Sequence, residues 1–190
     1  MWKFATAGAA PLSPVQFLFA ALIALAFVTP ATAAPPTCKE FKARLSKAEK
    51  ALGIAVPVPE YQDLGTLDDR RDWKLTIKGI EGELSCRKDD DGFSSLQLTV
   101  IGDDKYIDAR FHNLVFASLW AYTQWPRAKA YRAMTSMLAN AKRDLRNSRV
   151  RGENGASGTG AIDLEADVSA SIYGGEALRL GMMIDASAAK

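Results

Sequence analysis

Three acidic residues near the C-terminal end of the chain have the spacing of a catalytic carboxylate pair. Asp163, Glu165 and Asp167 alternate with apolar residues, so on a strand they would share one face, with neighbours about 7 Å apart. A glycosidase holds two carboxylates at a similar separation. Because any strand with one face in water shows the same alternation, the sequence leaves open whether these residues form the site of a small hydrolase or a solvated face.

His112 is the only histidine, and it follows Asp108 by one helical turn. An Asp–His pair does chemistry only together with a nucleophile or a metal ion. The sequence has no second histidine, no cluster of thiols and no G-x-S-x-G motif to supply either. We therefore predict no catalytic residue, no metal and no cofactor, and interpret the pair as part of a helix surface.

Two further segments have the composition of ligand-binding loops without their spacing. Asp89, Asp90 and Asp91 lack the alternate spacing and the distant glutamate of a calcium-binding EF-hand loop, and Asp-Gly is typical of a hairpin turn. The glycine-rich segment 152–160 precedes a predicted strand, whereas phosphate-binding loops follow a strand and open a helix. We therefore predict a hairpin turn at the aspartates and a flexible loop at the glycines.

Positive charge is concentrated in residues 127–151, which contain eight basic residues and one acidic residue, Asp144, a net charge of +7. The eight cations are Arg127, Lys129, Arg132, Lys142, Arg143, Arg146, Arg149 and Arg151. On a helix, five of them project to one side, away from the apolar stripe; these are Lys129, Arg132, Lys142, Arg143 and Arg146. This side is interpreted either as a solvated face, since cations are favourable near a helix C-terminus, or as a surface for an anionic envelope component or a protein partner.

Phe116 and Trp120 lie one turn apart on the preceding predicted helix, nearly opposite its main apolar stripe. That helix is therefore apolar on two sides. Either it is sandwiched between a sheet and another helix, or Phe116 and Trp120 form an apolar contact surface.

Residues 1–34 have the order of a cleavable signal peptide: Lys3, an apolar run from Phe17 to Val28, and small residues that end at Ala34. The run of twelve residues is shorter than the roughly 20 that a membrane-spanning helix needs, so we expect no transmembrane helix in the mature chain. Cleavage near Ala33 or Ala34 would yield a periplasmic or extracellular protein. No nucleic-acid partner is expected, because no nucleic-acid-binding motif is present and the chain is predicted to be exported.

Residues 35–190 are predicted to form a single domain that contains both cysteines, Cys38 and Cys86. An even number of cysteines in an exported chain predicts a disulfide. Closing the loop between them would stabilise the fold by about 4 kcal/mol in the chain-entropy model.

The first half of this domain is predicted to contain one helix and a three-stranded meander. A capping-box pattern at Thr37–Glu40 opens a helix that runs to Leu52, and an extended connection follows over residues 54–72. Alternating apolar residues then predict strands at 73–77, 84–86 and 96–100, with Ile77 opposite Leu84 and Cys86 opposite Leu96.

The second half is predicted to contain two helices and a hairpin. The helices run from Asp103 to about Tyr122 and onward from Pro126, and the short joint between them favours an antiparallel pair. The apolar stripe of the later helix is Tyr131, Met134, Leu138, Ala141 and Leu145. A long strand over 162–173 and a three-residue loop, Gly174 to Glu176, would place Ile172 opposite Leu178 and Val168 opposite Met182.

This order of elements predicts an α+β fold in which helices pack on one face of a mostly antiparallel sheet. The absence of a catalytic constellation, together with the basic helix, makes an exported, non-enzymatic binding or interaction protein the leading functional hypothesis. A small extracytoplasmic hydrolase that uses the strand carboxylates is the alternative.

Overall fold

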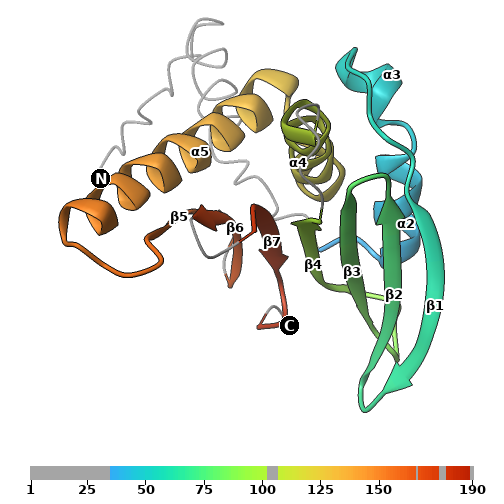
Figure 1. The fold of residues 1–190 in the computed structure, drawn as a ribbon. Coiled ribbons are helices and arrows are strands. Elements are labelled where there is room, and N and C mark those ends of the chain that lie inside the picture. The colour runs from blue at the N-terminus through green and yellow to red at the C-terminus, as the bar shows by residue number, and fades with distance from the viewer. Residues whose placement is uncertain (1–34, 102–106, 166, 176–178, 189–190) are drawn as a thin grey trace, which may run out of the picture. The chain divides into compact units, whose positions relative to one another are not determined.

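The strands of the described residues form one antiparallel sheet of seven strands, in the order β1-β2-β3-β4-β7-β6-β5 (Figure 1). The computed structural model describes residues 35–101, 107–165, 167–175 and 179–188. The strands are β1 (Glu60–Leu67), β2 (Arg70–Ile77), β3 (Ile80–Arg87), β4 (Phe93–Val100), β5 (Ser157–Glu165), β6 (Val168–Gly175) and β7 (Gly181–Asp185). Helices and antiparallel strands together make the fold α+β, as predicted.

The meander of the first half has four strands, so the prediction of three was incomplete. Strand β1 and the start of β2 occupy most of the predicted extended connection. Strand β1 is an edge strand with seven of its eight residues exposed, so it lacks the apolar alternation that marks a half-buried strand. Its backbone pairs with β2 through a register that shifts between Asp63 and Gly65.

The predicted pairing within the meander was wrong by a few residues. Ile77 pairs with Ile80 across a tight turn, and Leu84 pairs with Trp73 on one side and Leu96 on the other. Cys86 lies opposite Phe93, after a register shift. The same face of each strand is buried in both arrangements. The shift of register is even between β2 and β3 and at Leu84, so it preserves the side to which a residue points, and the irregularity before Cys86 compensates for the odd shift there.

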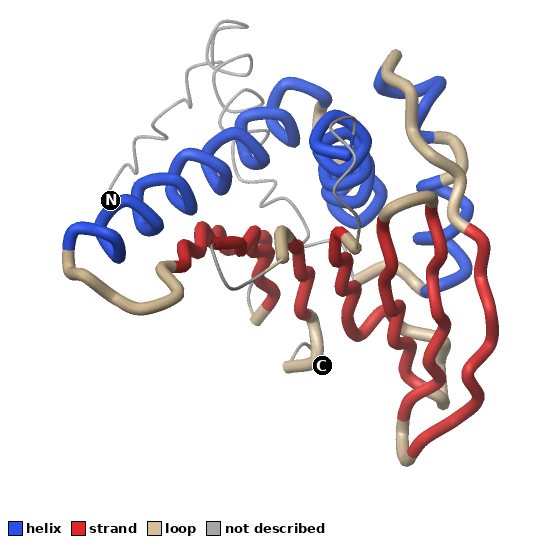
Figure 2. Tube along the Cα trace, in the orientation of Figure 1, coloured by secondary structure: helices blue, strands red, loops and turns tan. Residues whose placement is uncertain are grey.

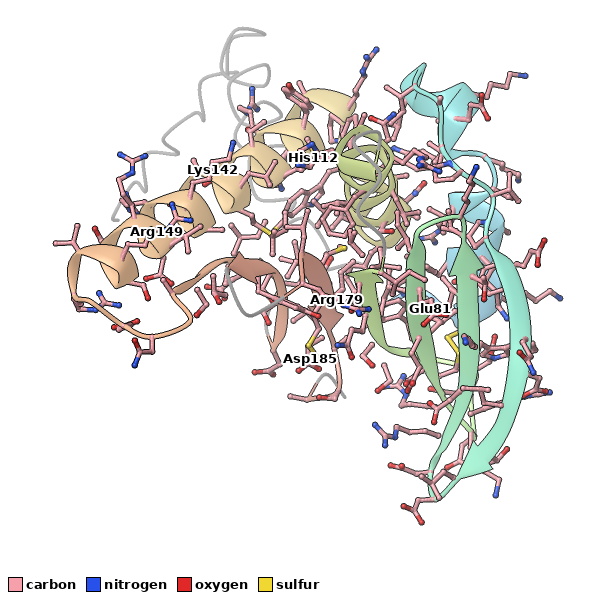
Figure 3. The ribbon with its side chains drawn as sticks, in the orientation of Figure 1. Glu81, His112, Lys142, Arg149, Arg179 and Asp185 are labelled. Carbon is pink, nitrogen blue, oxygen red and sulfur yellow. A yellow bond between two sulfur atoms is a disulfide. The ribbon has the colours of Figure 1, made fainter. Side chains whose placement is uncertain are left out.

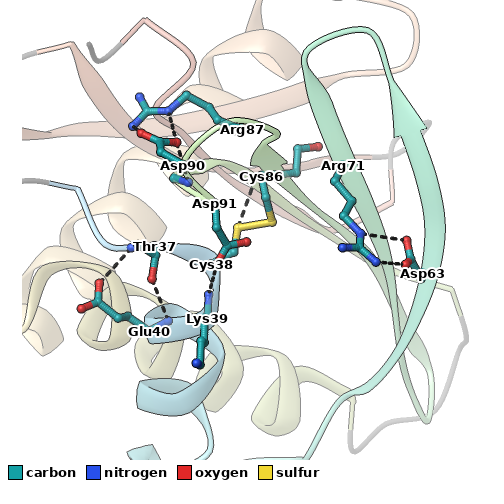
Figure 4. Close-up of a disulfide and its surroundings, with 12 residues drawn as sticks. Thr37, Cys38, Lys39, Glu40, Asp63, Arg71, Cys86, Arg87, Asp90 and Asp91 are labelled. Carbon is teal, nitrogen blue, oxygen red and sulfur yellow. Dashed lines mark hydrogen bonds and ion pairs between the residues drawn. A yellow bond between two sulfur atoms is a disulfide. The ribbon is translucent and has the colours of Figure 1, made fainter.

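The predicted N-terminal helix is divided into α2 (Cys38–Leu45) and α3 (Ala48–Leu52). Its capping box is confirmed: the Thr37 hydroxyl accepts a hydrogen bond from the Glu40 backbone N–H, and the Glu40 carboxylate accepts one from the Thr37 N–H (Figure 4). The Thr37 backbone N–H lowers the pKa of Glu40. Both bonds satisfy backbone donors that a helix start leaves unpaired.

The predicted disulfide is confirmed, and it joins the first residue of α2 to β3. Cys38 and Cys86 are both buried, with their Cα atoms 6.0 Å apart (Figure 4). The Cys38 backbone N–H also donates to the Asp91 carbonyl. The start of the helix is thus tied covalently and through its backbone to the β3–β4 hairpin.

The C-terminal strand predicted over 162–173 is two strands, β5 and β6, which pair around a turn at Asp167. Asp167 has a left-handed φ of 60°, a conformation that Asp tolerates better than most residues. Ile172 pairs with Met182 rather than with Leu178, so the predicted three-residue hairpin loop was also wrong. Residues 176–178 lie outside the described residues.

Helices α4 (Ile107–Thr123) and α5 (Arg127–Val150) follow the predicted ranges, although residues 102–106 lie outside the description. Figure 1 shows α4 nearly end-on and α5 lengthwise, so the two helices cross at a steep angle and are not the expected antiparallel pair. The joint contains Gln124 in a left-handed conformation and Pro126 in an extended one. Together they redirect the chain between the helices.

The helices and the inward side chains of the strands share one hydrophobic core. Aromatic rings connect its layers: the ring centroid of Phe93 on β4 lies 5.0 Å from that of Phe41 on α2 and 4.9 Å from that of Tyr122 on α4. Within the described residues, no helix is both long and apolar enough to cross a membrane.

Candidate functional site

All eight cations predicted to bind an anionic partner are exposed on α5 or at its C-terminal end. We define the basic face of α5 as the four whose positions cluster opposite the buried side of the helix: Arg132, Lys142, Arg143 and Arg146. The buried side chains of α5 are Ala130, Met134, Met137 and Ser148. At 100° per residue, these two sets project in opposite directions.

Asp144, the one acidic residue of α5, does not lie within the basic face. Its carboxylate accepts a hydrogen bond of 3.0 Å from the backbone N–H of Thr159 on β5, and its side chain is half-buried. The contact turns the negative charge of the helix toward the sheet. The positive charge of the opposite side therefore has no carboxylate from the same helix beside it.

Other cations of the predicted set have partners elsewhere. Arg151 forms an ion pair with Glu153 at 2.6 Å, and Lys129 lies over the ring of Trp125, with its Nζ 3.7 Å from the ring centroid. The guanidinium of Arg143 donates to the side chain of Asn140, which carries no charge. Figure 3 places Lys142 and Arg149 along the length of α5.

Helix α5 lies along β5 (Figure 2), and the glycines of β5 determine how closely the two approach. A Cβ atom on Gly160 would lie 1.9 Å from the Met137 carbonyl oxygen, and one on Gly158 would lie 2.2 Å from that of Ala141. The segment 152–160 was predicted to be a flexible loop, but its last four residues begin β5. Because Gly158 and Gly160 have no side chain, the backbone of α5 packs directly against the backbone of β5.

Phe116 and Trp120, the aromatic residues of interest on α4, are buried or partly buried within the fold. Phe116 is 4% exposed, and its ring packs edge-on against Tyr131 of α5 with the centroids 5.6 Å apart. Trp120 is half-buried against the core. The second apolar side of α4 therefore faces another helix at Phe116, which is the sandwiched arrangement of the two that the sequence allowed.

The strand carboxylates line a hollow of about 570 Å³ at one end of the sheet. Asp163 and Glu165 lie on β5, but Asp167 lies in the turn, so the three do not alternate along one strand. Asp185 of β7 joins them, with its carboxylate accepting hydrogen bonds from the backbone and the hydroxyl of Ser187. Asp185 could not be identified from the sequence, because its place depends on the pairing of β6 with β7.

The structure places the remaining candidates of the sequence on α4 and in the β3–β4 turn. His112 is half-buried on α4, and the side chain of Asp108 lies outside the described residues. Asp90 forms an ion pair with Arg87 at 2.9 Å and accepts the Gly92 backbone N–H, which is the role of a turn residue. Within the described part of the chain, the one cluster with metal-ligand proximity is Cys38, Cys86 and Asp91, but both sulfur atoms are committed to the disulfide.

A cation–aromatic cluster between α2 and β2 was not foreseen. The Nζ of Lys42 lies 3.5 Å from the centroid of the Trp73 ring, and the guanidinium carbon of Arg71 lies 4.9 Å from it. Burial lowers the pKa of Lys42. The cluster holds α2 over the sheet through contacts between residues 31 positions apart, which no local pattern reveals.

A groove of about 300 Å³ runs beside α5, and the sequence did not predict it. Its apolar wall includes Leu138 and Leu145 of α5, Ile172 of β6 and Leu180. The two α5 leucines were expected to be core residues, but both remain half-exposed. We call this feature the α5 groove.

No family model matches the chain, and neither a curated protein nor a solved structure shows significant similarity to it.

Proposed function

We propose that this chain is an exported, non-enzymatic binding protein that contacts anionic lipid headgroups through the basic face of α5. The observation that carries the proposal is the orientation of charge on this helix. Arg132, Lys142, Arg143 and Arg146 are exposed on one side, whereas the only carboxylate of the helix, Asp144, is bound to the backbone of β5.

The shape of the basic face favours a planar partner. From Arg132 to Arg146 the helix rises about 21 Å, at about 1.5 Å per residue, and the cations lie along a convex helix surface. A membrane surface presents many anionic groups to such an array, and each nearby Lys or Arg contributes about 1 kcal/mol. Four cations are then sufficient for weak binding that salt can reverse.

Export is supported by two independent features. The disulfide between Cys38 and Cys86 is typical of proteins that fold in an oxidising compartment. The second feature is the signal-peptide pattern of residues 1–34 in the sequence. A periplasmic or extracellular protein after cleavage near Ala33 or Ala34 is therefore part of the proposal.

The proposal is tested by sedimentation with vesicles of phosphatidylglycerol and of phosphatidylcholine. The variant changes Arg132, Lys142, Arg143 and Arg146 to Gln, and a control variant makes the same change at four exposed cations elsewhere, Lys50, Arg70, Lys78 and Lys88. Parent and control should bind the anionic vesicles at low ionic strength and dissociate as screening shortens to about 8 Å near 0.15 M salt. Equal binding by the basic-face variant and the parent would exclude the proposed surface.

A small hydrolase remains the second candidate because the predicted carboxylates line a hollow. A glycosidase needs one carboxyl in a water-poor environment that keeps it protonated, whereas Asp163 and Asp167 are exposed and Glu165 is only half-buried. This arrangement favours binding over catalysis. Hydrolysis of a glycan by the parent but not by Glu165→Gln would reverse that order.

A further inference from the structure

The α5 groove lies beside the contact between α5 and β5. Gly158 of β5 and Gly174 and Gly175 of β6 form part of its lining, and at Gly158 the backbone of α5 is too close to leave room for a side chain. The rest of the lining is mostly apolar and consists of Leu138, Ala141, Lys142 and Leu145 of α5, Ile172 and Tyr173 of β6, Leu180, and His112 of α4. The groove therefore presents half-exposed leucine side chains to solvent at the edge of the core.

A single cation connects this groove to the basic face of α5. Lys142 lines the groove and is also one of the four cations of the basic face. It lies four residues after Leu138 and three before Leu145, so all three project from neighbouring parts of the helix surface. A lysine on a flexible apolar stem can lay that stem along the groove while its ammonium stays at the mouth.

A largely apolar groove that Lys142 lines is complementary to an amphiphile with an anionic head. We propose that the α5 groove binds one hydrocarbon chain of such a molecule, with Lys142 at its head group. The volume of about 300 Å³ is at the lower end of the range for ligand pockets, which suits a single chain rather than a diacyl lipid. The proposal rests on the proposed membrane contact for the source of the ligand, because the same helix would bring the groove to the lipid surface.

Binding can be measured without vesicles by using the fluorescent fatty acid 11-(dansylamino)undecanoic acid. Its emission should rise and shift to the blue when the folded parent is added. Unlabelled saturated fatty acids should displace it, with the affinity rising about fourfold per added methylene until the groove is filled, since each buried methylene contributes about that factor. An alkyltrimethylammonium of equal chain length should displace it poorly, because Lys142 repels its head.

Four variants separate the groove from the basic face. Leu138→Trp narrows the groove at a half-exposed position and should weaken probe binding at least tenfold, and Leu145→Asn, which makes the wall polar, should do the same. Lys142→Gln should weaken binding of a fatty acid but not of the matching alcohol. Arg132→Gln lies on the basic face outside the groove and should leave probe binding unchanged, and urea midpoints verify that each variant is folded.

The results distinguish this proposal from the membrane contact. If the parent binds the probe and both wall variants lose that binding, the result supports amphiphile binding in the groove, whether or not the protein binds vesicles. No probe binding, affinity independent of chain length, or wall variants that bind as the parent does would overturn it, even if vesicle binding depends on the basic face. If free fatty acid displaces the probe but phosphatidylglycerol vesicles do not, the ligand comes from solution as a free amphiphile. If both displace the probe, the ligand comes from the membrane.

Discussion

The carboxylate of Asp144 accepts the backbone N–H of Thr159 at 3.0 Å, so the only acidic residue of α5 is bound to the edge strand of the sheet. This contact joins two properties of the helix. It contributes to the position of α5 over β5, and it removes negative charge from the side of the helix where Arg143 and Arg146 are exposed.

Replacing Asp144 separates these two properties. Asp144→Ala should lower the free energy of unfolding by about 1 to 2 kcal/mol, because the backbone N–H of Thr159 loses a charged acceptor. Vesicle binding per folded molecule should be unchanged or stronger, since the helix gains net positive charge. Urea denaturation and sedimentation measure the two effects. Asn140→Ala, which removes an exposed contact of the same helix, should change stability by less than about 0.5 kcal/mol.

The glycine contact between β5 and α5 should be intolerant of a single methyl group. In Gly160→Ala the new Cβ would lie 1.9 Å from the Met137 carbonyl oxygen, so α5 must move away from the strand. We expect a loss of about 3 kcal/mol in unfolding free energy, as is typical of an overpacked core. Ala161→Ser, at the next and exposed position of β5, is the control; equal stability of both variants would show that the helix does not rest on Gly160.

The disulfide gives a prediction that mass spectrometry can check directly. When the chain is expressed with export to a bacterial periplasm, the purified protein should have no cysteine that reacts with an alkylating reagent before reduction. Replacing both Cys38 and Cys86 by Ala should lower the free energy of unfolding by about 4 kcal/mol, from the loop that the disulfide closes. Two alkylated cysteines in the native protein would contradict both the disulfide and the oxidising compartment.

Tyr122 should make stability sensitive to alkaline pH. Burial raises its pKa from 10.0 to about 12, and within the described residues its hydroxyl has no hydrogen-bond partner. Since the folded pKa is the higher one, the stability linked to this group is complete below pH 10.0 and is lost as the pH rises through about 12. Tyr122→Phe should therefore be at least as stable as the parent at neutral pH.

The same variant should lose less stability than the parent across the alkaline range. Urea midpoints at neutral pH and between pH 10.0 and about 12 provide the comparison. Tyr61, whose pKa burial also raises to about 12, titrates in both proteins and does not affect the difference. A parallel decline of parent and variant would show that the Tyr122 hydroxyl is not buried in solution.

Local patterns were sufficient for the approximate ranges of the helices and for the disulfide. The Thr37–Glu40 capping box is a contact between neighbours in sequence, and the inward positions of Cys38 and Cys86 follow from helical and strand periodicity. These features depend on residue spacing alone, so they were predicted with their partners.

Strand number and pairing depend on the tertiary structure and were predicted less well. Leu164 and Val168 are both buried on adjacent strands, so the apolar alternation continues through the turn at Asp167 and resembles one long strand. Strand β1 is exposed at the sheet edge and has no alternation to detect. The glycines of 152–160 resemble a linker in sequence, and only the position of α5 shows why Gly158 and Gly160 have no side chain.

Contact between α5 and an anionic membrane can be measured most directly with a fluorophore at Ala139. This exposed residue lies on the outer side of α5 among the four cations, so an NBD group on Ala139→Cys should become brighter and shift to the blue with phosphatidylglycerol vesicles but not with phosphatidylcholine. The same label on Thr76→Cys, exposed on β2, should not respond. If the protein binds the vesicles while the label at position 139 is unchanged, or while both labels respond equally, the basic face of α5 is not the membrane contact.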